Sequence, residues 1–215
     1  MFDFFKSKKT EKTKPVMPEV LGLRLGGAVE LNVLKLRMTD DYTIFENVAK
    51  IQAIQAVGVV KLDEHSTIVR YYTDDDGFFQ VILNGGMTES HIEDLKLWFF
   101  YDTQGVSGNT EWNAQLKSGI SKPEHELSGQ KFYRVWSDVS ADSPPVSMTE
   151  TTTCSDGSES TTDQFVMLYE RESKPDFFEF LMLSGEEKII DNHPERCLVF
   201  STGINLSSAD FEIIG

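Results

Sequence analysis

The sequence of 215 residues is poor in cysteine and in basic residues, and it has no long hydrophobic run. Its two cysteines, Cys154 and Cys197, do not suggest a disulfide scaffold, and a chain of this length buries enough surface to fold without one. No apolar run approaches the ~18 residues that span a bilayer, which argues against an integral membrane protein. Twenty Lys and Arg stand against 35 Asp and Glu, a formal charge of −15, which argues against a nucleic-acid surface.

Signatures of catalysis and of cofactor binding are also missing. The sequence has no GxGxxG after a strand, no GxxxxGK[ST] and no GxSxG. None of the four histidines stands in an HxH or HxxxH spacing, and no CxxC occurs. His193 and Cys197 lie four residues apart, but Pro194 argues against a helix that would align them, so a buried strand cysteine is favoured over a zinc ligand or nucleophile. The sequence assigns no catalytic residue and no cofactor, and it leaves an enzyme open but unsupported.

The charge is distributed unevenly along the chain. Residues 1–14 carry five Lys against Asp3 and Glu11, a charge of +3, so the remaining chain carries −18. Residues 135–170 contain seven acidic residues and no Lys or Arg. This block favours a solvated face, with a binding face for a basic partner or a divalent cation as the alternative. The interaction candidates in it are Asp138, Asp142, Glu150, Asp156, Glu159 and Asp163.

Residues 1–15 are predicted to form a basic, flexible tail. This segment does not have the apolar core and cleavage site of a secretory signal, so we expect a cytoplasmic protein with reduced thiols. Aromatic rings next to lysines also suit weak contact with an anionic membrane surface, against the simpler interpretation of a disordered terminus. The residues that would make this contact are Phe2, Phe4, Phe5, Lys6, Lys8 and Lys9.

The rest of the chain, residues 16–215, is predicted to be one β-rich domain, mainly β or α+β. Asp76-Gly77 between residues 67–73 and 78–83 is a strong hairpin signal, and the Ser/Thr-rich residues 147–163 favour an exposed hairpin at Asp156-Gly157 over a low-complexity loop. Residues 110–117 are the best short helix. We expect about nine to eleven short, mostly antiparallel strands with one or two short helices.

The acidic turn and the aromatic residues each allow two interpretations. Asp74, Asp75 and Asp76 could bind Ca²⁺ or Mg²⁺, but the twelfth position from Asp74 is Gly85 and not the Glu of an EF-hand, so a backbone turn is favoured. Adjacent aromatics such as Phe99-Phe100 point to opposite faces of a strand. They predict a core between two layers, with a protein interface, including a homodimer, as the alternative.

Several stretches together resemble a known family: LGLRLGGAVEL (21–31), RYYTDDDGFFQ (70–80), LKLWFFYDT (95–103), YRVW (133–136), TDQFVMLYERE (162–172) and RCLVFSTGINL (196–206). The sequence resembles the YjfK-like bacterial family of unknown function over nearly the whole chain after the tail. The resemblance implies no activity and no site residue. Relatives tend to be encoded near a phage-shock-A-like membrane-stress protein and an ATP-grasp ligase resembling glutathionylspermidine synthase, so the resemblance implies an accessory role in a cytoplasmic, membrane-proximal stress system.

Two hypotheses follow. The first is a cytoplasmic, non-catalytic interaction protein with a protein partner, a membrane-stress protein being one candidate. The alternative is a carboxylate-based enzyme or a divalent-cation-binding domain. A cleft in which carboxylates with strongly raised pKa converge would count heavily against the first hypothesis.

Overall fold

The structure is a computed structural model that describes residues 17–32, 34, 36, 40–136 and 142–215. The predicted tail with its membrane-contact residues therefore lies outside the described residues, and so does Asp138. No helix in the described part of the chain is long and apolar enough to cross a membrane.

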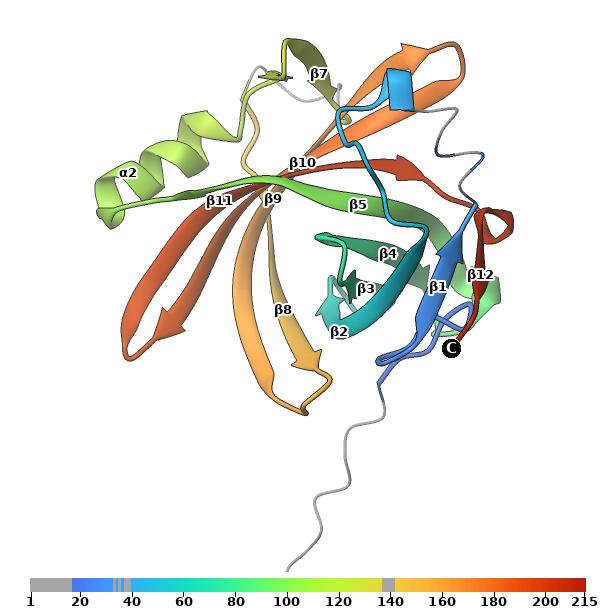
Figure 1. Ribbon diagram of the computed structural model, residues 1–215. Helices are drawn as coiled ribbons and strands as arrows, with labels where there is room; N and C mark the ends of the chain where they lie inside the picture. Colours follow the sequence, from blue (N-terminus) through green and yellow to red (C-terminus); the bar gives the residue numbers. More distant parts are fainter. Residues whose placement is uncertain (1–16, 33, 35, 37–39, 137–141) are drawn as a thin grey trace, which may run out of the picture.

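Twelve strands form the described structure, which confirms the mainly β prediction (Figure 1). They are β1 Ala28–Leu31, β2 Ile51–Lys61, β3 Ser66–Thr73, β4 Gly77–Asn84, β5 Ile92–Gly105, β6 Glu124–Leu127, β7 Gln130–Arg134, β8 Val146–Cys154, β9 Glu159–Lys174, β10 Phe177–Ile190, β11 His193–Asn205 and β12 Phe211–Ile213. The helical segments are η1 Asp40–Tyr42, η2 Glu89–His91, α2 Gly108–Ala114, the π-helical η3 Gln115–Gly119 and η4 Ser208–Asp210. The segment α2–η3 covers the predicted helix at 110–117.

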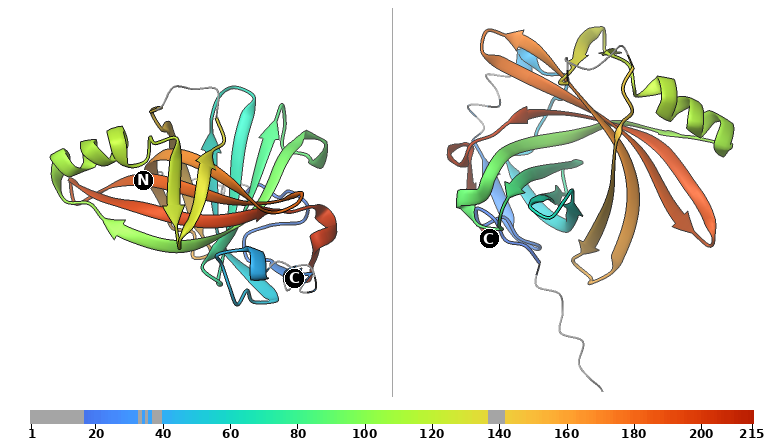
Figure 2. Two further views of the ribbon diagram at one scale, coloured as in Figure 1. Left: turned by 90° about the horizontal axis from the view of Figure 1, so that it is seen from above. Right: turned by 180° about the vertical axis from the view of Figure 1, so that it is seen from behind.

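Eight of the strands close into an antiparallel barrel. The hydrogen-bonded order is β2-β3-β4-β5-β11-β10-β9, and β8 completes the circle because it pairs with both β9 and β2. Figure 2 shows these strands from above and from behind, with the β8–β9 and β10–β11 hairpins splayed apart. Because the sheet closes, each of the eight strands has a hydrogen-bonded neighbour on both sides, and none is an edge strand of an open sheet.

Both predicted Asp-Gly hairpins are confirmed. Asp76 adopts a left-handed backbone conformation (φ 49°) between β3 and β4, and Gly157 does so (φ 83°) between β8 and β9. Short polar residues and glycine tolerate this conformation best, so the turn residues fix where each strand reverses. The strands β5, β9, β10 and β11 have 13 to 16 residues and are longer than expected. β9 reaches this length because its first half pairs with β8 and its second half with β7.

The barrel strands are buried on both faces. On the outside of β3, β4 and β5, side chains such as Tyr71 and Phe79 pack with the segment that contains Val20 and Leu23 and with β1 and β12. A second outer cluster covers β9, β10 and β11. On the inside, a third cluster contains Phe78, Trp98, Val166, Phe180 and Met182. Adjacent aromatics such as Phe78 and Phe79 therefore enter two different cores.

A polar cavity inside the barrel

The barrel encloses a cavity of about 250 Å³ that is lined by side chains from all eight of its strands. Alternate residues of a strand point to the same face, which explains why the lining residues recur at every second position. The lining residues are Ala56, Arg70, Tyr72, Phe78, Phe100, Glu150, Thr152, Ser160, Thr162, Gln164, Met182, Ser184, Glu186, Val199 and Ser201. The cavity shares Phe78 and Met182 with the inner apolar cluster, so it adjoins the packed part of the barrel interior.

Arg70 on β3 and Glu150 on β8 form a buried ion pair in the cavity wall. The Arg70 Nη1 lies 2.9 Å from Glu150 Oε2, and the two side chains are 4% and 2% exposed. Arg70 also donates to Gln80 Oε1 at 2.9 Å and to Gln164 Oε1 at 2.7 Å. Burial alone would lower the pKa of Arg70, but the Glu150 charge and Tyr72 raise it overall, so the guanidinium stays charged.

Glu150 is saturated by its neighbours. Its Oε1 accepts a hydrogen bond from the Tyr72 hydroxyl at 2.8 Å, and its Oε2 accepts from Arg70 and from Gln164 Nε2 at 2.8 Å. Burial raises the pKa of Tyr72, so its hydroxyl keeps the proton that it donates. Gly58 on β2 makes room for this carboxylate, because a Cβ at position 58 would overlap Glu150. The surroundings of Glu150 on β8 are therefore formed by three further strands, β2, β3 and β9.

Glu186 on β10 is the second carboxylate in the cavity, and it is only partly satisfied. Gln164 Nε2 donates to its Oε1 at 3.3 Å, a long bond that Gln164 shares with Glu150. Burial raises the pKa of Glu186, and the Glu150 charge adds to this, while Arg70 and Ser184 lower it. Ser184 lies close enough to influence Glu186, yet its buried hydroxyl makes no hydrogen bond of normal geometry with any described residue.

Three aromatic rings form another wall of the cavity. The Tyr72 and Phe100 rings are nearly parallel with centroids 6.4 Å apart, and Phe78 lies 5.3 Å from Tyr72 and 5.4 Å from Phe100. Phe100 keeps 43% of its surface exposed although it lines the cavity. Its exposed ring indicates that the cavity is open to solvent on this side.

The carboxylates of the acidic turn, for which a cation site was the less favoured interpretation, accept hydrogen bonds mainly from backbone amides. Asp74 Oδ1 accepts from the Ala53 amide at 2.8 Å, and Asp75 Oδ2 accepts from the Ala49 amide at 2.8 Å and from Gln52 Nε2 at 2.7 Å. Asp76 occupies the left-handed turn position. Among the described residues, no group of three or more His, Cys, Asp or Glu side chains is placed to hold a metal ion. The turn carboxylates fasten β2 to the β3–β4 hairpin.

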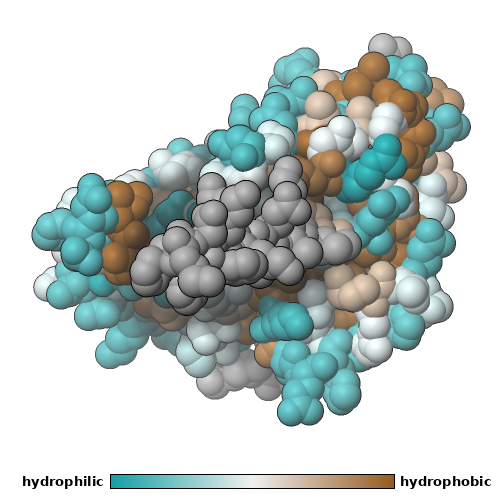
Figure 3. Space-filling view, turned by 90° about the horizontal axis from the view of Figure 1, so that it is seen from below, coloured by the Kyte–Doolittle hydropathy of each residue, from teal (hydrophilic) through white to brown (hydrophobic). Residues whose placement is uncertain are grey.

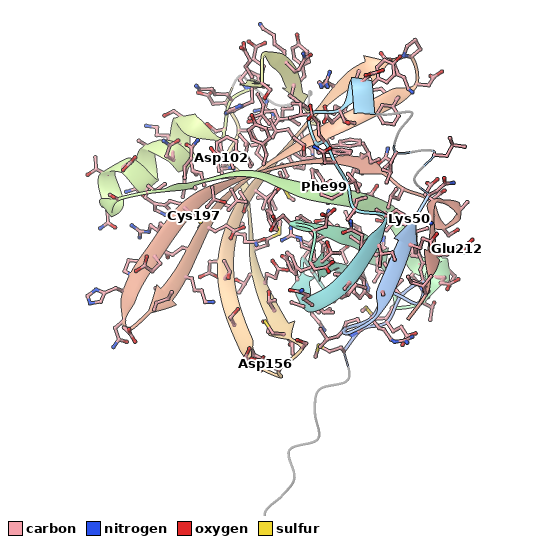
Figure 4. All side chains as sticks on the ribbon, viewed as in Figure 1. Lys50, Phe99, Asp102, Asp156, Cys197 and Glu212 are labelled. Atoms are coloured by element: carbon pink, nitrogen blue, oxygen red, sulfur yellow. The ribbon has the colours of Figure 1, made fainter. Side chains whose placement is uncertain are left out.

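The predicted acidic interaction residues divide between the surface and the interior. Asp142, Asp156, Glu159 and Asp163 are exposed, and Figure 4 shows Asp156 at the tip of the β8–β9 hairpin. Glu150 is a correction, because it is 1% exposed and points into the barrel. Glu150 and Thr152 are two residues apart on β8 and therefore lie on the same face of the strand, the face that lines the cavity. Glu150 cannot contribute to an acidic outer face.

The cysteines and the exposed apolar residues give no second site. Cys154 and Cys197 are free thiols on β8 and β11, and Figure 4 labels Cys197 at the latter. Burial, followed by the Glu186 charge, raises the pKa of Cys197. Ile189 and Ile190, at the end of β10, are 61% and 47% exposed. Figure 3 shows that hydrophobic residues reach the surface in several places on the face seen from below.

Sequence reasoning missed Arg70, Gln164 and Glu186 as site residues. A signal for Arg70 existed, because it is a charge inside the apolar strand TIVRYYT, where an unpaired charge would be costly. Glu150 and Glu186 lie together in the cavity, and burial raises the pKa of Glu186. One carboxylate with a raised pKa falls short of the condition set above, which asks for several carboxylates with strongly raised pKa. The first hypothesis is therefore not overturned by this cavity, although the buried charges lie inside the barrel and not on its outer surface.

The fold thus defines a class of protein, a closed antiparallel barrel whose partly open interior cavity is lined by charged, polar and apolar side chains. A family model described as "Protein of unknown function (DUF2491)" matches residues 1–212, and the chain belongs to this family. It is also 28% identical over 221 residues to "Uncharacterized protein YjfK" of Escherichia coli (strain K12), and the match covers the whole of both chains. These matches confirm the resemblance. No solved structure matches the chain.

Proposed function

We propose that the protein is a non-catalytic binding protein that holds one small polar ligand inside its barrel. The observation that carries this proposal is the open cavity lined by all eight strands, with Arg70, Glu150 and Glu186 in its wall. Barrels of eight strands either fill their interior with side chains or hold one small ligand. Buried charges are costly to stability, and groups with a shifted pKa such as Glu186 gather at functional sites, which favours a ligand-binding role for this cavity.

The binding role extends the accessory function expected from the sequence. We propose that the protein acts in the cytoplasm and that its ligand-bound and ligand-free forms differ in their contact with a protein partner. A membrane-stress protein and a second copy of the chain are the two candidates from the sequence. The exposed carboxylates of the β8–β9 hairpin, Asp156, Glu159 and Asp163, are the proposed contact for a basic partner surface. A pull-down with and without the ligand, once identified, tests this part.

A carboxylate-based enzyme is the second candidate, and the raised pKa of Glu186 favours it. A general acid or base works best when its pKa lies near the operating pH. Against this candidate, Glu150 already accepts hydrogen bonds from Tyr72, Arg70 and Gln164, so only Glu186 is available for proton transfer. Conversion of a bound compound, followed by NMR over several hours, would favour the enzyme over the binding protein.

A cation-binding role of Asp74, Asp75 and Asp76 is tested by thermal unfolding with Ca²⁺ or Mg²⁺. A ligand at 100 times its dissociation constant adds about 2.7 kcal/mol to the free energy of unfolding. We expect no shift up to millimolar cation, because the Asp74 and Asp75 carboxylates are held by amide groups. A clear rise in Tm that is lost in Asp74→Asn would support the cation site.

The binding proposal is tested by a fragment screen with ligand-observed NMR on the full chain. Thr162 points into the cavity and its neighbour Thr161 is exposed on the other face of β9, so they form a matched pair. We expect fragments that bind the wild type and Thr161→Phe but lose binding in Thr162→Phe, whose ring fills the cavity. If no fragment binding depends on Thr162, the barrel interior is not a ligand site and the proposal fails.

A further inference from the structure

The cavity has an unbalanced charge. Three ionisable groups with opposite charges line it, namely Arg70, Glu150 and Glu186. Arg70 and Glu150 neutralise each other at 2.9 Å, so an ionised Glu186 leaves the cavity with one negative charge. No ion pair joins Glu186 to a cation within the described ranges. A positively charged ligand would restore neutrality inside the barrel.

Two groups in the cavity wall can accept a hydrogen bond from a ligand, namely the Glu186 carboxylate and the Ser184 hydroxyl, which can also donate. Gln164 donates to Glu186 Oε1 at 3.3 Å, and the Ser184 hydroxyl lies close enough to lower the pKa of Glu186, so Oε2 of Glu186 has capacity left for a ligand donor. The Ser184 residue is 5% exposed and its hydroxyl lacks a hydrogen-bond partner in the described structure. Buried polar groups are normally satisfied, and an orphan hydroxyl in a cavity wall is a site where a ligand donor fits. The two groups lie on the same strand, two residues apart, and face the same side.

The aromatic wall favours the same kind of ligand. The faces of Tyr72, Phe78 and Phe100 attract a cation through their quadrupoles, and this attraction grows as water is excluded. Arg70 already uses this wall, with its guanidinium carbon 5.5 Å from the Phe78 centroid. Glu150, Gln80 and Gln164 accept from the Nε and Nη1 groups of Arg70, and its Nη2 group contacts the Met182 sulfur at 4.0 Å. An anion beside Arg70 is disfavoured because the paired Glu150 carboxylate would repel it.

We propose that the cavity binds a small organic ammonium ion, whose N–H groups donate to Glu186 and Ser184 while its carbon chain packs against Tyr72, Phe78 and Phe100. This inference rests on the proposed binding function and gives the chemical class of the ligand. A volume of about 250 Å³ equals the share of about eight water molecules in the liquid, so the occupant is a small amine. A primary ammonium fits better than a quaternary one, which has no N–H for the two acceptors.

The test compares three probes of equal size: n-butylammonium, n-butanol and n-butyrate. Amide chemical shifts of the full-length protein are followed by NMR during titration with each probe at constant pH and ionic strength. We expect n-butylammonium to shift the amides of Ser184 and Glu186 and to bind at least tenfold more tightly than the other two probes. Glu186→Gln should weaken n-butylammonium at least tenfold. Glu187→Gln is the matched control, since the neighbouring residue faces outward and pairs with Arg196.

The outcomes distinguish a failure of the ammonium class of ligand from a failure of the proposed binding function. If n-butyrate or n-butanol binds as well as n-butylammonium, or if Glu186→Gln binds n-butylammonium like the wild type, the ammonium class is wrong while a ligand-binding barrel stands. If the fragment screen finds no binding that depends on Thr162, the barrel is not a ligand site and both fail. Glu186→Gln keeps the side-chain size, and its amide spectrum shows whether the fold is intact before binding is compared.

Discussion

Two buried arginine–glutamate pairs lie on opposite faces of the barrel wall, and they differ in what surrounds them. Outside, Arg171 Nη2 lies 2.6 Å from Glu179 Oε2, and Glu179 Oε1 accepts from the Ile44 amide at 2.5 Å. Arg171 donates further to the Tyr42 carbonyl oxygen at 3.0 Å. Inside, the Arg70–Glu150 pair is also satisfied, but a further carboxylate, Glu186, and the Ser184 hydroxyl stand beside it without full partners.

The difference separates a structural charge cluster from a candidate binding site. The outer pair fastens the segment at Tyr42–Ile44 to the barrel, and its remaining groups are used by protein atoms. The inner cluster leaves acceptors directed at an open cavity. The pKa of Glu179 and that of Glu186 are both raised, in each case mainly by burial, so a raised pKa alone does not distinguish the two. The two clusters are distinguished by the hydrogen-bonding capacity that Glu186 and Ser184 leave unused in the cavity.

Arg70→Met should produce the largest loss of stability. It leaves Glu150 buried without its cation, and breaking one partner of a buried ion pair costs about 3–5 kcal/mol. Urea unfolding measures the loss, with the exposed Arg24→Met as the control. The double variant Arg70→Met/Glu150→Gln should recover a large part of it. A loss below about 1 kcal/mol would show that the inner pair is not desolvated in solution.

Glu179→Gln should lower the free energy of unfolding by about 1.5–3 kcal/mol, the range for hydrogen bonds to charged groups. The Ile44 amide should exchange with deuterium faster, because its carboxylate acceptor is gone. Binding of n-butylammonium should be unchanged in this variant. If Glu179→Gln instead abolished binding, the two pairs would not be independent and the comparison would fail.

Gly58→Ala should destabilise the protein by about 1–3 kcal/mol, the usual cost of overpacking. The added methyl overlaps the Glu150 carboxylate, although alanine in a strand is normally better than glycine. Gly105→Ala in β5 is the control, since a Cβ there meets no atom within 4 Å. Equal stabilities of the two variants, measured by urea unfolding, would mean that Glu150 has room to move away from β2.

Glu186→Gln should change how stability depends on pH. Because the folded-state pKa of Glu186 lies above its ordinary value of 4.5, the folded state binds more protons than the unfolded state between these two pH values. The wild type therefore loses stability as pH rises through this window, and the variant does not. The difference, variant minus wild type, should grow with pH and then stay constant. A stability difference that does not change from pH 4 to 8 would show that the Glu186 carboxylate is exposed to solvent and that burial does not raise its pKa.

Cys197 offers the smallest effect. Its raised pKa, caused first by burial and then by Glu186, lowers the thiolate fraction and so slows alkylation. Glu186→Gln should speed alkylation by iodoacetamide at pH 8.5 by less than about tenfold, the change that one pKa unit gives. Mass spectrometry of the Cys197 peptide follows the rate. No change in rate would place the Glu186 carboxylate too far from the thiol to act on it.

The local turns were predictable, and the ring closure was not. Asp76-Gly77 and Asp156-Gly157 mark two hairpins in the sequence because few residues tolerate those backbone angles. The pairing of β8 with β2 joins Glu150 to Val60, and no local pattern reports a contact across ninety residues. Glu150 was expected on the surface but lies inside the barrel. Its side chain points to the face of β8 that becomes the interior once the sheet closes, and the sequence alone does not show which face that is.

The sequence by itself determined the strand-rich class, the two Asp-Gly hairpins and the family, because turn chemistry, strand composition and motif resemblance act over short stretches of chain. Only the tertiary structure decided the candidate site. Arg70, Glu150 and Glu186 lie on three strands that are far apart in the sequence, and the closed sheet brings them into one cavity. The physical reason is that a buried charge needs partners from neighbouring strands, and the order of those strands is set by long-range packing.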